Sequence, residues 1–215
     1  MKETASDFIA KSTVKAADKE HRRKINFNIG KYNAVVPKGK EQFTDINLAR
    51  ERAKNLKWKA IETLHKQLET CEAVISRLGA KVIWAEDAQQ ALEAIKKICD
   101  EKHCRTLVKS KSMVTEEIHL NDFLEKNGIE SVETDLGEYI QQLDGEPPYH
   151  IVTPAMHKSK EDVAKLFAEK LGTDPKATPE QLTLIARNIL REKYVQAEIG
   201  VTGANFIIAD IQQGF

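Results

Sequence analysis

A short polar segment, Lys109 to Ser112, holds the residues of this chain that are best suited to bind a ligand. It follows three residues typical of a buried strand, Thr106 to Val108, and precedes a helix that we expect to begin near Thr115. Where a strand passes through a polar loop into a helix, free backbone N–H groups meet the positive end of the helix dipole. The two lysines and two serines of the loop add positive charge and hydroxyl donors. The segment therefore predicts an anion-binding site formed by Lys109, Ser110, Lys111 and Ser112.

Side chains alternate along an extended segment, and this divides the loop into two pairs. Lys109 and Lys111 are expected on one side, and Ser110 and Ser112 on the other. A charge-assisted hydrogen bond contributes about 1.5–3 kcal/mol, so one lysine with two backbone amides could hold a carboxylate at about millimolar affinity. An ordinary polar loop whose serines cap the next helix explains the same residues, and both interpretations stay open.

Further candidate residues follow the loop or precede the last expected strand. Thr115 and the two glutamates after it are typical of a helix N-terminus, where acidic side chains are favoured by about 0.3–1 kcal/mol each. A catalytic carboxylate is the alternative, suggested by analogy with the fold, and Glu117 is the better candidate for it. Thr202 and Gly203 could let the backbone approach a ligand, although a plain turn explains them equally well.

The sequence gives little support to a metal or nucleotide site. Cys99 and His103 would lie one helical turn apart, but Cys99 also completes an apolar stripe. His150 and His157 flank an expected strand and are interpreted as structural histidines. We find no cysteine run of the iron–sulfur type, no glycine-rich dinucleotide loop and no phosphate-binding loop. We therefore expect no metal ligands and no cofactor in this chain.

Length and charge restrict the class of protein. The 215 residues suit one large domain, or one domain with an appendage. Lys plus Arg and Asp plus Glu number 33 each, so no net charge draws the chain to nucleic acid or to a membrane surface. No apolar run approaches the roughly 20 residues that span a bilayer, and the N-terminus lacks the features of a signal peptide. These features predict a cytoplasmic protein without nucleic-acid or membrane partners.

The first part of the chain is expected to lie outside the main domain. Residues 1–44 show no clear periodicity, and Pro37 to Lys40 predict a turn, so we interpret this segment as an N-terminal arm. Apolar residues at spacings of three and four predict a helix from Asp45 to Leu78, within a helical extension over residues 45–79. One continuous helix would be about 50 Å long. It is either broken or reaches out to pack on a partner or a second subunit.

Residues 80–215 are expected to form an α/β domain, because short strands alternate with helices and predict a mostly parallel sheet flanked by helices. The expected strands are 81–85, 106–109, 129–133, 150–153 and 205–209. The expected helices are 87–99, 116–127, 136–143, 159–171 and 178–198. Phe206 to Ala209 is a continuous apolar run, as in a strand buried on both faces, yet only six residues follow it. We therefore expect an incomplete sheet whose open edge, like the long helix, could favour self-association.

Several long strings of residues in a fixed order carry a resemblance to a known family. The longest are Val108 to Ile118, Glu133 to Ile140 and Ala197 to Phe206, with shorter ones at 142–143, 147–148, 150–152, 154–155 and 157–158. On these strings, nearly all of residues 45–209 resembles the LUD domain of the lactate-utilisation protein B family. So many matched strings in the same order exceed what a chance motif would give.

The resemblance implies a fold like that of sugar-phosphate isomerases and CoA transferases. It also implies a role in oxidising L-lactate to pyruvate as one subunit of a three-component iron–sulfur system, whose other subunits would be the partners. Full-length members of the family continue into further strands and a ferredoxin-like region, where cysteines hold four-iron four-sulfur clusters. This sequence departs from the family at Asp210, where Ile211 to Phe215 replace the expected turn.

We therefore expect the N-terminal LUD-domain part of a lactate-utilisation protein B-like subunit, truncated before the iron–sulfur region. Such a part would be at most a fragment of an oxidoreductase and would be inactive alone. Two alternatives stay open. One is a stand-alone module that binds a small carboxylate or phosphate metabolite through Lys109 and Lys111, and the other is a non-functional remnant.

Overall fold

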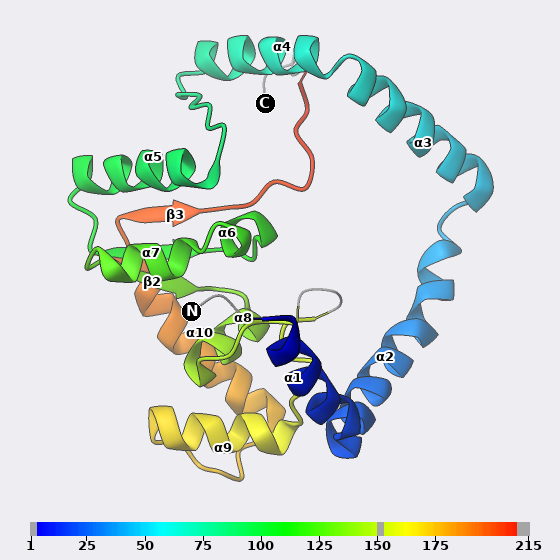
Figure 1. Ribbon diagram of the computed structural model, residues 1–215, viewed down its shortest axis with the longest axis vertical. Helices are drawn as coiled ribbons and strands as arrows, with labels where there is room; N and C mark the ends of the chain where they lie inside the picture. The colour runs from blue at the N-terminus through cyan, green and yellow to red at the C-terminus, as the bar shows by residue number, and fades with distance from the viewer. Residues whose placement is uncertain (1–3, 150–152, 210–215) are drawn as a thin grey trace.

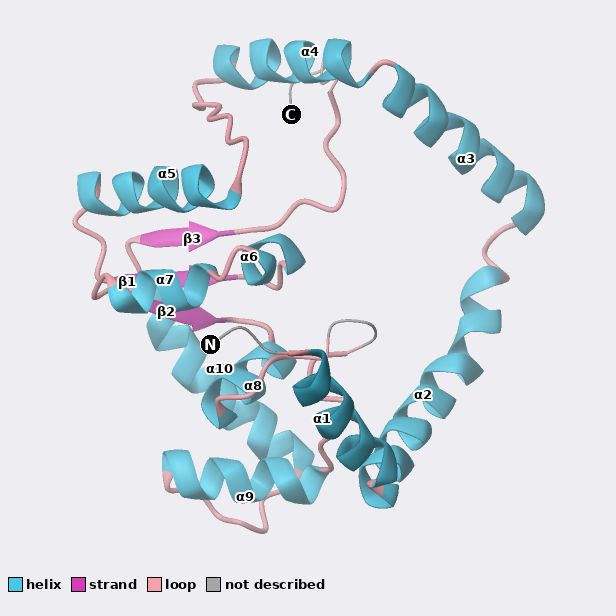
Figure 2. Ribbon diagram, viewed as in Figure 1, coloured by secondary structure: helices cyan, strands magenta, loops and turns pink. Residues whose placement is uncertain are grey.

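A computed structural model describes residues 4–149 and 153–209, which form helices around a small parallel sheet (Figures 1 and 2). The helices are α1 Ala5–Ala17, α2 Lys19–Lys40, α3 Ile46–Glu62, α4 Leu64–Arg77, α5 Ala88–Glu101, α6 Met113–Glu117, α7 Leu120–Lys126, α8 Leu136–Asp144, α9 Lys160–Leu171 and α10 Pro179–Gln196. The strands are β1 Thr106–Lys109, β2 Glu130–Glu133 and β3 Ile199–Val201. This arrangement agrees with the expected α/β class.

The sheet is open, and its three parallel strands lie in the order β2-β1-β3. Val108 in the central strand is paired with Val132 on one side and Gly200 on the other. Because successive side chains of a strand point to opposite faces, β1 contributes to two separate hydrophobic cores. Leu107 packs with residues of α5 and α7, whereas Val108 packs with residues of α8, α9 and α10. Helices thus cover both faces of the sheet. Because the three strands are parallel, their C-terminal ends lie at the same edge.

Local capping signals set the helix starts of this domain. Asp87 accepts a hydrogen bond from Gln90 N at the start of α5. Thr178 forms a capping box with Gln181 at the start of α10, where proline fills the first helical position. Ser159 forms a second capping box with Asp162 at the start of α9. These starts were expected from the sequence and are confirmed, as are β1 and β2.

Two expected strands are wrong. Residues 81–85 and 205–209 have no strand structure, and Trp84 and Phe206 are 55% and 81% exposed. An apolar run becomes a strand only when a neighbouring strand accepts and donates its backbone hydrogen bonds, and neither segment has one. The third strand is instead β3, earlier in the chain, where Ile199 and Val201 pack beside Leu107. The strand expected at 150–153 lies mostly outside the described residues.

The helix expected at 116–127 is also different in the structure, because it is divided into the short helices α6 and α7. His119 has a φ angle of 54° between them, in the left-handed region, and this stops a continuous helix. α6 has only five residues. Its dipole is therefore smaller than the sequence interpretation assumed.

The N-terminal part is helical rather than irregular. Thr4 and Asp18 cap α1 and α2 with side-chain hydrogen bonds, and the turn expected at Pro37 to Lys40 is the last turn of α2. The helix expected from Asp45 to Leu78 is broken at Thr63 into α3 and α4. No residue of α1 to α4 is buried. In Figure 1, α2, α3 and α4 follow an arc that stands apart from the sheet, and α4 lies above α5.

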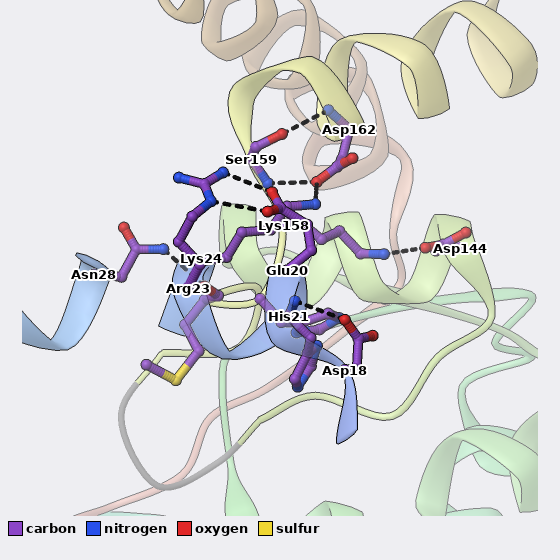
Figure 3. A network of polar contacts seen from close by, with 12 residues as sticks. Asp18, Glu20, His21, Arg23, Lys24, Asn28, Asp144, Lys158, Ser159 and Asp162 are labelled. Carbon is purple, nitrogen blue, oxygen red and sulfur yellow. Dashed lines mark hydrogen bonds and ion pairs between the residues drawn. The ribbon is translucent and has the colours of Figure 1, made fainter. Parts of the chain in front are cut away.

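The start of α2 is held to the domain by a polar network (Figure 3). The ammonium of Lys24 lies 2.5 Å from an Asp162 carboxylate oxygen. The amide of Asn28 donates to the Met156 carbonyl at 2.7 Å, and a ring nitrogen of His21 lies 3.1 Å from the Tyr149 hydroxyl. These contacts join residues more than a hundred positions apart, so the network fixes where the N-terminal helices leave the domain.

We predict that Lys24→Ala loosens this junction. Burial alone would raise the pKa of Asp162, but hydrogen bonds from Lys24 and Ser159 lower this pKa to about 2. Since the folded pKa is lowered, the pair stabilises the protein above pH 4 and loses that contribution as pH falls towards 2. The expected loss at pH 7 is about 1 kcal/mol or less, because the Asp162 side chain is partly exposed.

Urea unfolding at pH 7 and pH 3, with hydrogen exchange of residues 19–40, would measure the effect. Lys38→Ala, at an exposed position of the same helix, is the control. Equal exchange rates in the two variants would contradict the assigned contact.

Candidate functional site

A buried lysine lies at the C-terminal end of β1. The Lys109 side chain is 1% exposed, and its ammonium lies 2.6 Å from Glu133 and 2.8 Å from Glu116. It also donates to the Thr115 hydroxyl at 3.0 Å. Burial opposes the charge, but hydrogen bonds to the two carboxylates outweigh it and raise the lysine pKa. All three ammonium donors have partners, so Lys109 organises the site from inside the protein.

Lys111 is the lysine of the predicted anion loop that reaches solvent. Its side chain is 35% exposed, and its ammonium lies 3.9 Å from Oε1 of Glu138, too far for a hydrogen bond. Glu138 belongs to α8 and is almost completely buried. A cation and a carboxyl group from different elements therefore lie side by side without a full ion pair.

The two serines connect the loop to its surroundings. Ser112 caps α6 by accepting a hydrogen bond from Thr115 N. The Ser110 hydroxyl accepts from Gly203 N at 3.4 Å. A Cβ on Gly203 would lie 3.0 Å from the Ser112 side chain, so any other residue here would make Ser112 shift. Ser110, Ser112 and Gly203 thus join the loops that follow β1 and β3.

The remaining candidates of the sequence analysis take different places. Thr115 is buried and donates to the Ser112 carbonyl at 2.8 Å, besides accepting from Lys109. Thr202 is exposed beside Gly203. Glu117 is exposed on α6, whereas its neighbour Glu116 contacts Lys109. The structure therefore brings Glu116 rather than Glu117 into the cluster.

A cavity of about 370 Å³ opens beside this cluster. Its lining comes from α6, α7, α8, the end of β2 and the segment after α8, and includes Glu116, Asn121, Glu133, Glu138 and Gln141. Glu133 Oε2, Glu138 Oε1 and both amide atoms of Gln141 are buried without a hydrogen-bond partner. Buried polar atoms in proteins nearly always have partners, so this concentration beside one cavity marks a candidate binding site.

Glu138 is the acid whose protonation is most altered. Burial raises its pKa to about 7, with repulsion from Glu133 and Glu116 acting in the same direction. Lys111 and Lys109 oppose this but are too weakly coupled to restore the ordinary value. Glu138 can therefore accept or release a proton near neutral pH.

Sequence reasoning missed Glu133, Glu138 and Gln141 as site residues. Glu133 gave one usable signal, since it ends a strand parallel to β1, and ligand sites gather at the carboxyl ends of parallel strands. Glu138 and Gln141 lie one helical turn apart on α8 and gave no comparable signal. Their burial depends on how α8 packs.

The cysteines of this chain do not fit the iron–sulfur clusters that the family resemblance implies. A cluster of that kind needs four thiolates, and the sequence has three cysteines. Burial raises the pKa of Cys99 and Cys104, that of Cys104 to about 11, so both remain thiols at neutral pH. Cys71 lies on α4, outside the hydrophobic core that contains Cys99 and Cys104.

Within residues 4–149 and 153–209, no group of three or more His, Cys, Asp or Glu side chains is arranged to hold a metal ion. In the same part of the chain, no helix is both long and apolar enough to cross a membrane.

These features define a class of protein: an α/β domain of parallel strands with a buried lysine and an acidic cavity at the C-terminal edge of the sheet. Residues 68–211 match the model of the LUD domain. The chain belongs to the LUD-domain family.

Curated relatives carry the name lactate utilization protein B. That of Bacillus subtilis (strain 168) is 45% identical over 162 residues, which are 75% of this chain and 34% of the relative. That of Bacillus licheniformis is 44% identical over the same shares, and that of Macrococcus caseolyticus is 38% identical over 209 residues, 97% of this chain and 41% of the relative. The matched part is thus between a third and two fifths of the relatives' length. No solved structure matches the chain significantly.

We predict that Lys109→Met destabilises the domain by about 3–5 kcal/mol, because it leaves the buried Glu133 without its cation. Adding Glu133→Gln should recover part of the loss, since the uncompensated charge is then removed. Urea unfolding at pH 7 would measure both variants. Lys97→Met, at an exposed position on α5, is the control. A double variant no more stable than Lys109→Met alone would contradict the charge argument.

We also predict that Glu138→Gln changes how stability depends on pH. The folded pKa of about 7 is above the ordinary 4.5, so the stability associated with this group is present below pH 4.5 and lost as pH rises to 7. The loss is up to about 3 kcal/mol. The free energy of unfolding of the variant should therefore exceed that of wild type by more at pH 8 than at pH 5. Unfolding at both pH values, with Glu192→Gln on α10 as the control, measures this; equal differences would contradict it.

Proposed function

We propose that this chain is the LUD-domain part of a lactate-utilisation protein B-like subunit and that it takes part in the oxidation of L-lactate to pyruvate. The family membership and the names of the relatives support the pathway. The observation that carries the site is the Lys111–Glu138 pair at the C-terminal edge of the sheet. It places a partly exposed cation beside a carboxyl group that titrates near neutral pH.

The pair matches the two polar groups of an α-hydroxy acid. In this proposal the Lys111 ammonium binds the substrate carboxylate, since a hydrogen bond between charged groups contributes about 1.5–3 kcal/mol. Ionised Glu138 accepts the proton of the substrate hydroxyl. Lys109 stays beneath the site and holds Glu116 and Glu133 in place.

The overall reaction releases two electrons and two protons from lactate. In the proposal, Glu138 takes the hydroxyl proton as the C=O bond of pyruvate forms. The Cα–H bond breaks, and its hydrogen leaves with the electron pair, as a hydride, to a two-electron acceptor held outside this chain, on another subunit of the lactate-oxidation system. The three cysteines described above do not fit the clusters that the family implies. The domain thus contributes substrate binding and proton transfer.

A second candidate function is a stand-alone module for a small carboxylate or phosphate. The exposure of Lys111 at the joined loops favours it, because a simple anion could bind there without any electron acceptor. The two functions differ in one respect. The subunit should support lactate-dependent reduction of a dye when the partner subunits are added, whereas the module should bind without turnover.

We predict that the chain binds L-lactate and pyruvate at about millimolar Kd and that Lys111→Ala weakens binding by about tenfold or more. Affinity should fall as pH rises from 6 to 8, because ionisation of Glu138 brings a negative charge next to the bound carboxylate. Calorimetry at the two pH values measures this. In Glu138→Gln, the fall with pH should disappear.

The control is Lys126→Ala, which removes an exposed lysine from α7. Undiminished binding by Lys111→Ala, or a loss equal to that of the control, would contradict the assigned carboxylate site.

A further inference from the structure

The cavity beside the cluster has a strongly acidic lining. Among the residues that the structure describes, six carboxylates and no lysine or arginine line it; the six are Glu116, Asp122, Glu125, Glu133, Glu138 and Glu146. Lysines outside the lining neutralise part of this charge: Lys109 contacts Glu116 and Glu133, and Lys158 contacts Glu146. Lys111 lies 3.9 Å from Glu138, so Asp122 and Glu125 are the lining acids without a lysine contact among the described residues. A concave surface of one sign concentrates counter-ions, so this cavity attracts cations.

Gln141 is an independent sign of a ligand. The side chain is 1% exposed and lines the cavity, yet neither its amide oxygen nor its nitrogen has a partner. The next residue behaves differently, because the Gln142 amide donates to the Ser131 carbonyl and accepts from Glu133 N. A buried amide without partners costs about 1–3 kcal/mol. A bound molecule that donates to the Gln141 oxygen would recover part of this cost, because the amide nitrogen is a donor and needs a separate acceptor.

The unpaired atoms define the chemistry of that molecule. Glu133 Oε2, Glu138 Oε1 and the Gln141 oxygen are acceptors. Guanidinium and ammonium groups carry several N–H donors and a positive charge, and a guanidinium can pair with a carboxylate through two parallel bonds. A volume of about 370 Å³ is within the usual range for small-molecule pockets. A metal ion fits less well, because the described acids do not converge around one point.

We propose that this cavity binds an organic cation rich in N–H donors, a guanidinium or primary ammonium group, with Glu133, Glu138 and Gln141 as its acceptors. The cation is either a free metabolite or an arginine or lysine side chain of a partner protein, since both present the same group. This site lies beside the Lys111 position assigned to lactate and uses the opposite charge. The two sites share Glu138 but not Lys111 or Gln141, so Lys111→Ala tests lactate binding and Gln141→Leu tests the cation site.

Binding of such a cation is linked to protons. Four charged groups face Glu138 from the neighbouring elements: Glu133 on β2, Glu116 on α6, Lys109 on β1 and Lys111 in the loop. An added cation favours the ionised form, so binding displaces the proton that Glu138 carries below about pH 7. Affinity should therefore rise with pH between 6 and 8, in the direction opposite to that predicted for lactate.

Calorimetry on the full chain tests the proposal with ethylguanidinium, ethylammonium and a short blocked peptide that contains one arginine. We expect saturable one-to-one binding of at least one of these probes. The binding enthalpy at pH 7 should change between phosphate and MOPS buffers, because the released proton is taken up by the buffer and neither buffer is a primary ammonium. Tighter binding of the peptide indicates a partner side chain as the source, and tighter binding of a free cation indicates a metabolite.

Two variants make the test specific. Gln141→Leu keeps a similar volume without the amide, and Glu138→Gln removes the charge; each should weaken binding at least tenfold, and Glu138→Gln should abolish the buffer dependence. Glu192→Gln, an exposed acid on α10, is the matched control and should bind as wild type does. Circular dichroism establishes whether each variant is folded. If Gln141→Leu does not fold, Glu138→Gln alone tests the proposal. No saturable binding by wild type, or equal binding by Glu138→Gln and wild type, overturns the proposal.

Discussion

The buried ammonium of Lys109 is the constraint on which the rest of the site depends. It ends the central strand, inside the protein, where an uncompensated charge would cost several kcal/mol. Two carboxylates compensate this charge, Glu116 from α6 and Glu133 from the end of β2. Asn121 of α7 in turn donates to Glu133 at 2.8 Å. One charge thus fixes how two helices and a neighbouring strand meet at the carboxyl edge of the sheet.

The same cluster contains more carboxyl groups than lysines close enough to pair with them. This imbalance determines the protonation of Glu138 at the edge of the sheet. Lys109 is fully occupied by its partners, so Glu138 is left with only the distant ammonium of Lys111. Burial raises its pKa to about 7, and Lys111 is too far away to bring it back to the ordinary value. Glu138 lies beside Lys111 of the proposed anion-binding loop and also lines the acidic cavity. A single titrating group can therefore couple the two, with opposite signs for a bound anion and a bound cation.

The N-terminal helices follow a different physical rule from the domain. α3 and α4 bury no residue, and Trp58 and Leu56 are exposed, so these helices rest on their own backbone hydrogen bonds. Asp45 caps the start of α3, whereas α4 has no side-chain cap at its start. Their connection to the domain depends on a few polar contacts at the start of α2 (Figure 3). Such contacts between partly exposed groups are individually weak. The position of the first four helices is therefore less strongly determined than that of the core.

The sequence by itself determined the features that depend on neighbours along the chain. Capping boxes such as Thr178–Gln181, the amphipathic stripe of α5, strands β1 and β2, and the family strings all have local signals. The strands expected at 81–85 and 205–209 failed because strand structure also requires a partner strand, which no local pattern supplies. The prediction of one helix over 116–127 failed for a similar reason. His119 divides it, and a single residue in the left-handed region has no strong sequence signal.

Only the tertiary structure decided which polar residues form the site. Lys109 and Lys111 look equivalent in sequence, yet packing buries one with three partners and leaves the other at the surface. Glu138 and Gln141 became candidates because α8 packs against β2 and buries both side chains beside the cavity. Burial and missing partners, which set both the pKa and the demand for a ligand, belong to the surroundings of a residue. Residue type alone does not contain them.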